Sequence, residues 1–168
     1  MLADNETQDR LNQQLVEAVI LGDTARVREL IAEGVDPADE DSCALRWAAQ
    51  DGRLDIVRIL LDDGRANPRD DASACLRYAA EFGHTETVRL LLEDGRAEPA
   101  DEQSYALRWA CGYGHTDVVR ALLLDGRADP LAAQSEALRF AVQHGHTDTV
   151  RALLEDIRVD PLLRTARR

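Results

Sequence analysis

A chain of 168 residues is long enough for one domain or one short array of repeats, and a hydrophobic content of 45 % allows a buried core. The formal net charge of −12 disfavours nucleic acid as a partner, because a duplex-binding surface is normally basic. No apolar segment approaches the roughly 20 residues of a membrane span, and the acidic start does not resemble a secretory signal. The three cysteines, an odd number at wide spacing, favour reduced thiols, so we expect a cytoplasmic protein.

The sequence repeats with a period of 31 residues, which is its strongest signal. Glycine, leucine, alanine and valine recur in a fixed phase, and so do the prolines Pro37, Pro68, Pro99, Pro130 and Pro161. We expect a single repeat domain over residues 1–168, with units near 11–37, 42–68, 73–99, 104–130 and 135–161. Short helices are marginal alone, so such units must stack to bury a continuous core.

The first unit, 11–37, is one residue shorter than the others and more polar. Its Gln13, Gln14, Val16 and Glu17 stand where internal units carry mostly apolar residues or arginine. Because a terminal repeat needs a polar outer face, we expect this unit to act as a cap.

The second unit shows where the first helix of each pair begins and ends. Ser42 precedes the apolar pattern, where a serine can cap a helix. Leu45, Ala48 and Ala49 have the i, i+3, i+4 spacing of one helical face, and Gly52 ends the helix. Small alanines at these positions let neighbouring helices approach closely.

The second helix of each unit has its own signals. Val57, Leu60 and Leu61 again share one helical face, and Gly64 closes the segment. In the later units we expect N-caps at Thr85, Thr116 and Thr147. No segment alternates long enough to form a strand, so the predicted fold is all-α.

Arginine recurs in three series, and all 20 basic residues are arginine. For the absence of lysine, coding bias is the simpler explanation and avoidance of ubiquitin attachment is the alternative.

The second-helix series, Arg58, Arg89, Arg120 and Arg151, favours i, i+4 pairs with Asp62, Glu93 and Glu155. For the first-helix series, Arg46, Arg77, Arg108 and Arg139, we expect a structural role rather than an anion-binding groove. Its expected partners are the loop acids Asp39, Asp41, Asp70, Asp71, Asp101 and Glu102. A third series follows the closing glycines at Arg65, Arg96, Arg127 and Arg158.

Histidine and cysteine do not form a pattern that favours a metal. His84, His115 and His146 are one repeat apart, about 10 Å when stacked, whereas zinc ligands lie about 2 Å from the metal. We expect these histidines to bond local backbone groups. Cys75 and Cys111 stand where other units carry alanine, so we expect small buried residues and no disulfide. No catalytic or cofactor motif occurs, so we expect no enzyme, no cofactor and no metal site.

The repeat resembles the ankyrin repeat family. The likeness is carried by "ALRWAAQDGRLDIVRILLDDG" at 44–64, "CLRYAAEFGHTETVRLLLEDG" at 75–95 and "ALRWACGYGHTDVVRALLLDG" at 106–126. The family's Thr-Pro-Leu-His opening is absent, and the unit is shorter than the family's roughly 33 residues where its β-hairpin finger projects. The resemblance therefore implies an ankyrin-type α-solenoid of five helix-turn-helix repeats with short or absent hairpins.

The resemblance also implies where a partner binds. In ankyrin repeats the residues after the Ala-Ala pair face the concave groove, and here they vary within a constant frame. We therefore expect the partner-binding residues to be Gln50, Asp51, Glu81, Phe82, Gly112, Tyr113, Gln143 and His144. An aromatic series with the same period, Trp47, Tyr78, Trp109 and Phe140, is either inter-repeat core or a binding stripe; we favour the core.

The fifth unit has no polar outer face, unlike the first. Leu153 and Leu154 match the internal pattern, and the last seven residues, with Leu162 and Leu163, are too few for another helical pair. We expect this end to be under-capped, which predicts either a longer array or tail-to-tail self-association.

Together these features predict a protein-protein interaction module that recognises a basic or neutral protein surface through its concave helical face and loops. The first alternative is a structural or idealised scaffold, or a fragment of a longer array, without its own ligand. The second is a substrate-recognition subunit for ubiquitin transfer, suggested by the absent lysines.

Overall fold

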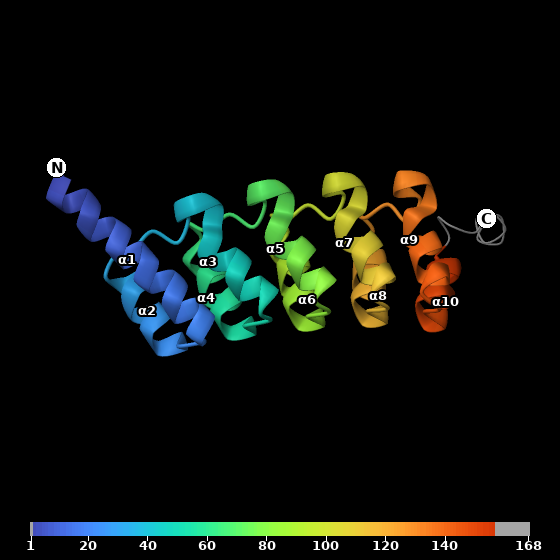
Figure 1. Ribbon diagram of the computed structural model, residues 1–168, viewed down its shortest axis with the longest axis horizontal. Coiled ribbons are helices and arrows are strands. Elements are labelled where there is room, and N and C mark those ends of the chain that lie inside the picture. Colours follow the sequence, from blue (N-terminus) through green and yellow to red (C-terminus); the bar gives the residue numbers. More distant parts are fainter. Residues whose placement is uncertain (1, 157–168) are drawn as a thin grey trace.

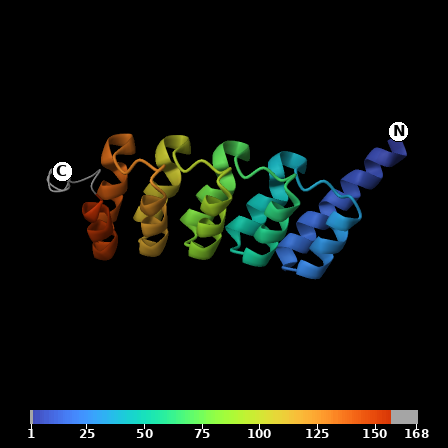
Figure 2. The same ribbon diagram turned by 180° about the vertical axis from the view of Figure 1, so that it is seen from behind.

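The computed structural model describes residues 2–156, which form ten α-helices in five consecutive pairs (Figure 1). Their bounds are α1 (Leu2–Leu21), α2 (Thr24–Ala32), α3 (Asp39–Gln50), α4 (Leu54–Asp63), α5 (Asp70–Glu81), α6 (Thr85–Asp94), α7 (Asp101–Gly112), α8 (Thr116–Asp125), α9 (Ala132–Gln143) and α10 (Thr147–Glu155). Opposite views show the pairs side by side in one row, with α1 and α10 at opposite ends (Figures 1 and 2). The expected all-α solenoid of helix-turn-helix units is confirmed.

The connections between pairs are short, as expected. Residues 64–69 and 95–100, for example, join one pair to the next without any strand. Within residues 2–156 no β-hairpin finger forms.

The odd-numbered helices form one layer of the row, which we call the inner layer, and the even-numbered helices form the outer layer. Ala48, Ala49, Ala79 and Ala80 are fully buried between neighbouring inner helices. These helices pack against each other more extensively than the outer helices do, because alanine lets backbones approach closely.

Large apolar side chains fill the space between the two layers. Leu60, Leu91, Leu122 and Leu153 are completely buried, one in each of the outer helices α4 to α10. Burying a leucine contributes roughly 1.5–3 kcal/mol, so this ladder supplies much of the stabilisation of the stack.

The buried cysteines behave as the small core residues expected from their positions. Cys75 and Cys111 are buried and unpaired. Burial raises the pKa of both thiols to about 12, so both are protonated at neutral pH.

The turn between the helices of a pair differs from the expected threonine cap. Thr85, Thr116 and Thr147 are the first residues of their helices, and the preceding histidines hold the N-cap positions. His84 Nε2 lies 2.8 Å from the Gln50 carbonyl oxygen of the preceding unit. His115 and His146 make the equivalent contacts. The histidines therefore bond the backbone as expected, but they join neighbouring repeats instead of local groups.

The inner helices α3, α5, α7 and α9 each start with a left-handed turn that sequence reasoning missed. Glu40, Asp41 and Ser42 have φ values of 49°, 55° and 57°, and the same turn recurs in the next three units. Such φ values cost non-glycine residues about 1–2 kcal/mol each, so neighbouring groups must hold the turn. Arg46 does so by donating from Nη2 to the Glu40 carbonyl oxygen at 3.2 Å, and Arg77 and Arg108 bond the equivalent carbonyls.

The serine of this turn is not the cap of its own helix, contrary to expectation. Ser73 accepts a hydrogen bond from the backbone N–H of Glu98 at 2.8 Å and donates to Asp101 Oδ2 at 2.7 Å. Ser42 makes the same pair of bonds. The serines therefore fasten the loop that leads to the next inner helix.

The outer-helix arginines pair with different acids from those expected. Arg89, Arg120 and Arg151 contact the acid three residues earlier, at 3.1, 3.2 and 3.0 Å. Arg89 and Arg151 thus do not use the expected acids Glu93 and Glu155 four residues later. These pairs are exposed, so each contributes about 0.2–1 kcal/mol at most.

Two members of the third arginine series, Arg96 and Arg127, cap the outer helices of the preceding unit. Arg96 forms two bonds of 2.8 Å with the Asp94 carboxylate, and its guanidinium also donates to the carbonyls of Leu61, Gly64 and Ala66 at 3.2, 3.3 and 3.1 Å. Arg127 repeats this arrangement one unit later. A helix leaves its last carbonyls without partners, and a guanidinium supplies the missing donors.

This bridge makes stability sensitive to acid. The hydrogen bond from Arg96 lowers the pKa of Asp94. A carboxylate whose pKa is lower folded than unfolded stabilises the fold above its unfolded pKa of about 4, and that contribution is lost as the pH falls through the folded value. We expect Asp94→Asn to melt at a lower temperature than the wild type at pH 7, with the difference shrinking below about pH 4. Melting curves at several pH values, with the exposed Asp62→Asn as the charge control, test this; a pH-independent difference contradicts it.

The two ends of the row differ in their exposed apolar surface. Gln13 and Glu17 of α1 are exposed while Leu15 is buried, as expected for a polar cap. In the last pair Leu154 is exposed, whereas Leu153 is completely buried like the equivalent leucines of the internal units. Leu162, Leu163 and Arg158 lie outside the described residues.

Candidate functional site

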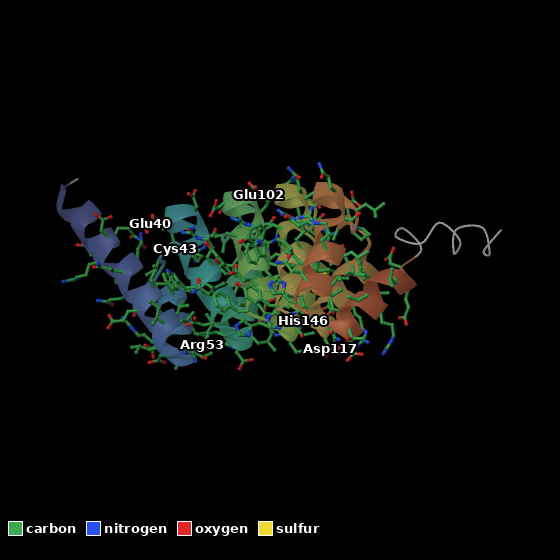
Figure 3. The ribbon with its side chains drawn as sticks, turned by 45° about the vertical axis from the view of Figure 1, so that its right-hand side comes forward. Glu40, Cys43, Arg53, Glu102, Asp117 and His146 are labelled. Atoms are coloured by element: carbon green, nitrogen blue, oxygen red, sulfur yellow. The ribbon has the colours of Figure 1, made fainter. Side chains whose placement is uncertain are left out.

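The eight expected binding residues lie along one edge of the inner layer. Gln50, Glu81, Gly112 and Gln143 are the last residues of α3, α5, α7 and α9, and Asp51, Phe82, Tyr113 and His144 follow as their C-caps. Figure 3 shows this edge through Arg53 and His146, opposite the edge with the left-handed turns of Glu40 and Glu102.

Two of these eight residues have large aromatic side chains that are exposed to solvent. Phe82 is 51 % exposed and Tyr113 is 50 % exposed. Asp51, Gln143 and His144 are also exposed, whereas Gln50, Glu81 and Gly112 are half-buried. The backbone carbonyls of the three half-buried residues accept the histidine contacts, so this edge is held rigidly.

The aromatic series of the inner helices lies at the surface rather than in the core. Trp47 is 39 % exposed, and Tyr78, Trp109 and Phe140 are half-buried. Trp109 and Phe140 do pack across neighbouring repeats, with ring centroids 6.0 Å apart. The expected inter-repeat packing is present there, but the expected burial is not.

Three aromatic rings form a continuous row along α7. Tyr105, Trp109 and Tyr113 are spaced i, i+4, i+8, with centroid separations of 5.5 and 5.6 Å. We call these three residues the aromatic stripe. Tyr105 was missed by the sequence reasoning, although its four-residue spacing from Trp109 was the available signal.

Charged groups surround the aromatic stripe and fix its first ring. The guanidinium carbons of Arg77 and Arg108 lie 5.3 and 5.7 Å from the Tyr105 ring centroid, within cation–π range. Burial raises the pKa of Tyr105, and the nearby Glu81 carboxylate raises it further. The Tyr105 hydroxyl is therefore protonated at neutral pH and available as a hydrogen-bond donor.

The inner-layer arginines have the structural role expected of them, although only one predicted loop carboxylate pairs with them. Arg46 and Arg77 lie 3.5 and 3.6 Å from Asp71. Asp70 and Asp101 accept from serines instead. Over residues 2–156 the inner layer therefore offers no free row of guanidinium groups for an anion.

A hollow of about 510 Å³ lies between α1 and α3, on the first two units. Its rim carries the carboxylates Asp9, Asp36, Asp39 and Glu40, and Trp47 contributes to its lining. Sequence reasoning did not anticipate it, because it depends on α1 packing beside α3.

Two further classes of site are not found in the part of the chain that is described. Within residues 2–156 no group of three or more His, Cys, Asp or Glu side chains could hold a metal ion. Over the same range no helix is both long and apolar enough to span a membrane.

Comparison with known proteins identifies the protein family. No curated protein matches the sequence. A family model described as ankyrin repeats, in three copies, matches residues 15–102 and 96–164, which is most of the chain. The matched ranges include helices α2 to α10, with the buried alanines and the turn histidines that join one unit to the next. The chain therefore belongs to the ankyrin repeat family.

Proposed function

We propose that this protein recognises a partner protein through its inner layer and the adjoining turns, with the aromatic stripe as the anchor. Ankyrin repeats are generally protein-protein interaction modules. The observation that carries the proposal for this chain is the row of adjoining rings at Tyr105, Trp109 and Tyr113, of which Tyr105 and Trp109 are half-buried and Tyr113 is exposed. Aromatic residues and arginine dominate the energetics of protein interfaces, so this is where most of the binding energy is expected.

The positions around the aromatic stripe support the same proposal. Phe82 holds in the preceding unit the place that Tyr113 holds in its own, and both are half exposed. Exposed aromatic residues in neighbouring units form an apolar patch of the kind that marks interaction sites. The net charge of −12 favours a basic or neutral partner surface.

Paired affinity captures test the proposal. The wild type and a Tyr105→Ala/Tyr113→Ala variant serve as baits in the same lysate, and Leu124→Ala is the control, since Leu124 is 89 % exposed on the outer helix α8. We expect a stoichiometric partner with the wild type and the control but not with the double variant. For the purified partner we expect the double variant to bind about thirtyfold more weakly, or about 2 kcal/mol.

Two results would contradict the proposal. One is a partner that binds the double variant as tightly as the wild type. The other is a clearly lower melting temperature of the double variant, which would mean that the rings belong to the core.

A further inference from the structure

The hollow between α1 and α3 lies outside the aromatic stripe, and four carboxylates stand on its rim. The Asp39 carboxylate accepts from the Asn12 amide at 2.8 Å, and Asp36 accepts from a backbone N–H. Among the described residues no arginine forms an ion pair with Asp9, Asp36, Asp39 or Glu40.

An arginine crosses each of the three later interfaces between inner helices, which are α3–α5, α5–α7 and α7–α9. Arg46 of α3 reaches Asp71 of α5, with Nη1 3.5 Å from the carboxylate. Arg77 of α5 lies over the ring of Tyr105 of α7. Arg108 of α7 forms an ion pair with Glu136 of α9. A guanidinium from one unit therefore contacts the first turns of the next inner helix three times in succession.

The first interface, between α1 and α3, has an acidic residue at the equivalent position but no equivalent arginine to pair with it. In the first unit the position of Arg46 is held by Val16, 30 residues earlier because this unit is one residue shorter. Glu40 stands 31 residues before Asp71 and so holds the equivalent acidic position. Both Val16 and Glu40 line the hollow. The Glu40 carboxylate at the α1–α3 interface is thus equivalent to the Asp71 carboxylate at the α3–α5 interface. Asp71 has the Arg46 guanidinium beside it, whereas Val16 of α1 supplies no such group to Glu40.

We propose that this hollow binds an arginine side chain of the partner, which takes the place that Arg46 fills one interface later. The four rim carboxylates attract the guanidinium, and the partly exposed Trp47 ring offers a cation–π face. Leu15, Val16 and Pro37 give an apolar lining for the methylene stem of the side chain. This inference rests on the proposed function, because it names the chemistry of the recognised partner.

The probe is N-acetyl-arginine amide, with N-acetyl-citrulline amide as its uncharged counterpart. The two tryptophan indole N–H groups give separate NMR signals, which a Trp109→Phe variant assigns. We expect a saturable shift of the Trp47 signal with the arginine compound, with the Trp109 signal moving little and the citrulline compound binding at least roughly tenfold more weakly. No saturable shift at Trp47, or equal binding of both compounds, overturns the proposal.

Three variants locate the site. Asp39→Asn/Glu40→Gln should weaken binding roughly tenfold, whereas Asp62→Asn/Glu93→Gln, which removes the same charge from exposed positions of the outer helices, should leave it nearly unchanged. Val16→Arg should abolish the Trp47 response, because it supplies the missing guanidinium from α1. Equal losses in the two double variants would show that only net charge matters. An undiminished response in a folded Val16→Arg protein would also overturn the inference.

This test is independent of the proposed function. It uses no partner protein and leaves the aromatic stripe intact in every variant that is titrated. If the hollow fails to bind arginine while captures still depend on Tyr105 and Tyr113, only the further inference is lost. If the hollow binds arginine but no partner is captured, the proposed function is the part that fails.

Discussion

The variant Arg96→Ala is expected to lower the free energy of unfolding by about 3 kcal/mol, because hydrogen bonds from charged donors contribute about 1.5–3 kcal/mol and unpaired groups add a penalty. The guanidinium of Arg96 donates to three carbonyls at the end of α4 and binds Asp94 of its own unit. Its removal leaves that helix end without donors and loosens the contact between two repeats. Urea denaturation of the two proteins side by side measures the loss.

Arg65→Ala is the matched control for this prediction. Arg65 binds Asp63 as Arg96 binds Asp94, at 2.8 and 2.9 Å. Within the described residues it makes no bond to a backbone carbonyl of the preceding unit. Its side chain is partly exposed, so the pair should contribute less than about 1 kcal/mol. Equal destabilisation by Arg65→Ala and Arg96→Ala would contradict the role of Arg96 as a cap between repeats.

Gly114→Ala is expected to destabilise the fold by about 3 kcal/mol, combining a positive-φ penalty of about 1 kcal/mol with loss of a buried contact. Gly114 has a φ of +73°, and an added Cβ would lie 2.5 Å from Nδ1 of His146. The histidine must move, which breaks its 2.9 Å contact with the Gly112 carbonyl oxygen. Thermal unfolding of the variant measures the effect.

Gly145→Ala separates the two parts of this cost. Gly145 has nearly the same φ, +75°, but among the described residues no side chain comes within 4 Å of its added Cβ. Only the conformational penalty of about 1 kcal/mol should appear there. In a double-mutant cycle, Gly114→Ala and His146→Ala should cost less together than the sum of the single variants, since the first already displaces the histidine. Additive losses would contradict the steric explanation.

The overall fold could be predicted from the sequence because its signals are local and repeated. Leu45, Ala48 and Ala49 show the buried face of the inner helices, and Gly64 marks the end of an outer helix, which the structure bears out. The absence of hairpins followed from the short unit. These features depend only on helical spacing and on turn chemistry.

The details that sequence reasoning missed depend on neighbouring units. Ser73 resembles a helix cap in the sequence, yet its partners lie 25 and 28 residues later. Arg96 was recognised as periodic, but its backbone acceptors lie 30 to 35 residues earlier. The left-handed turn at Glu40–Ser42 has no glycine to reveal it. Its stabilisation comes from a tertiary contact with Arg46, which local propensity does not report.

The residues of the proposed binding surface were recognised in the sequence only in part for the same reason. Phe82 and Tyr113 were found because their positions vary within a constant frame. Tyr105 and the acidic hollow at Glu40 become visible only when α7 and α1 are placed in the stack. Trp47 and Trp109 are two units apart, roughly 20 Å at the usual helix spacing, which corresponds to about six residues of an extended chain. A partner segment with an arginine and an apolar anchor at that separation would engage both places.

The most direct test of recognition by the inner layer is photo-crosslinking with the captured partner. A photoreactive phenylalanine analogue replaces Tyr113 in one protein and Leu124, on the outer layer, in another. We predict a crosslink to the partner from position 113 and none from position 124. Crosslinking from position 124 alone would show that the partner binds the outer helices and would contradict the proposed function.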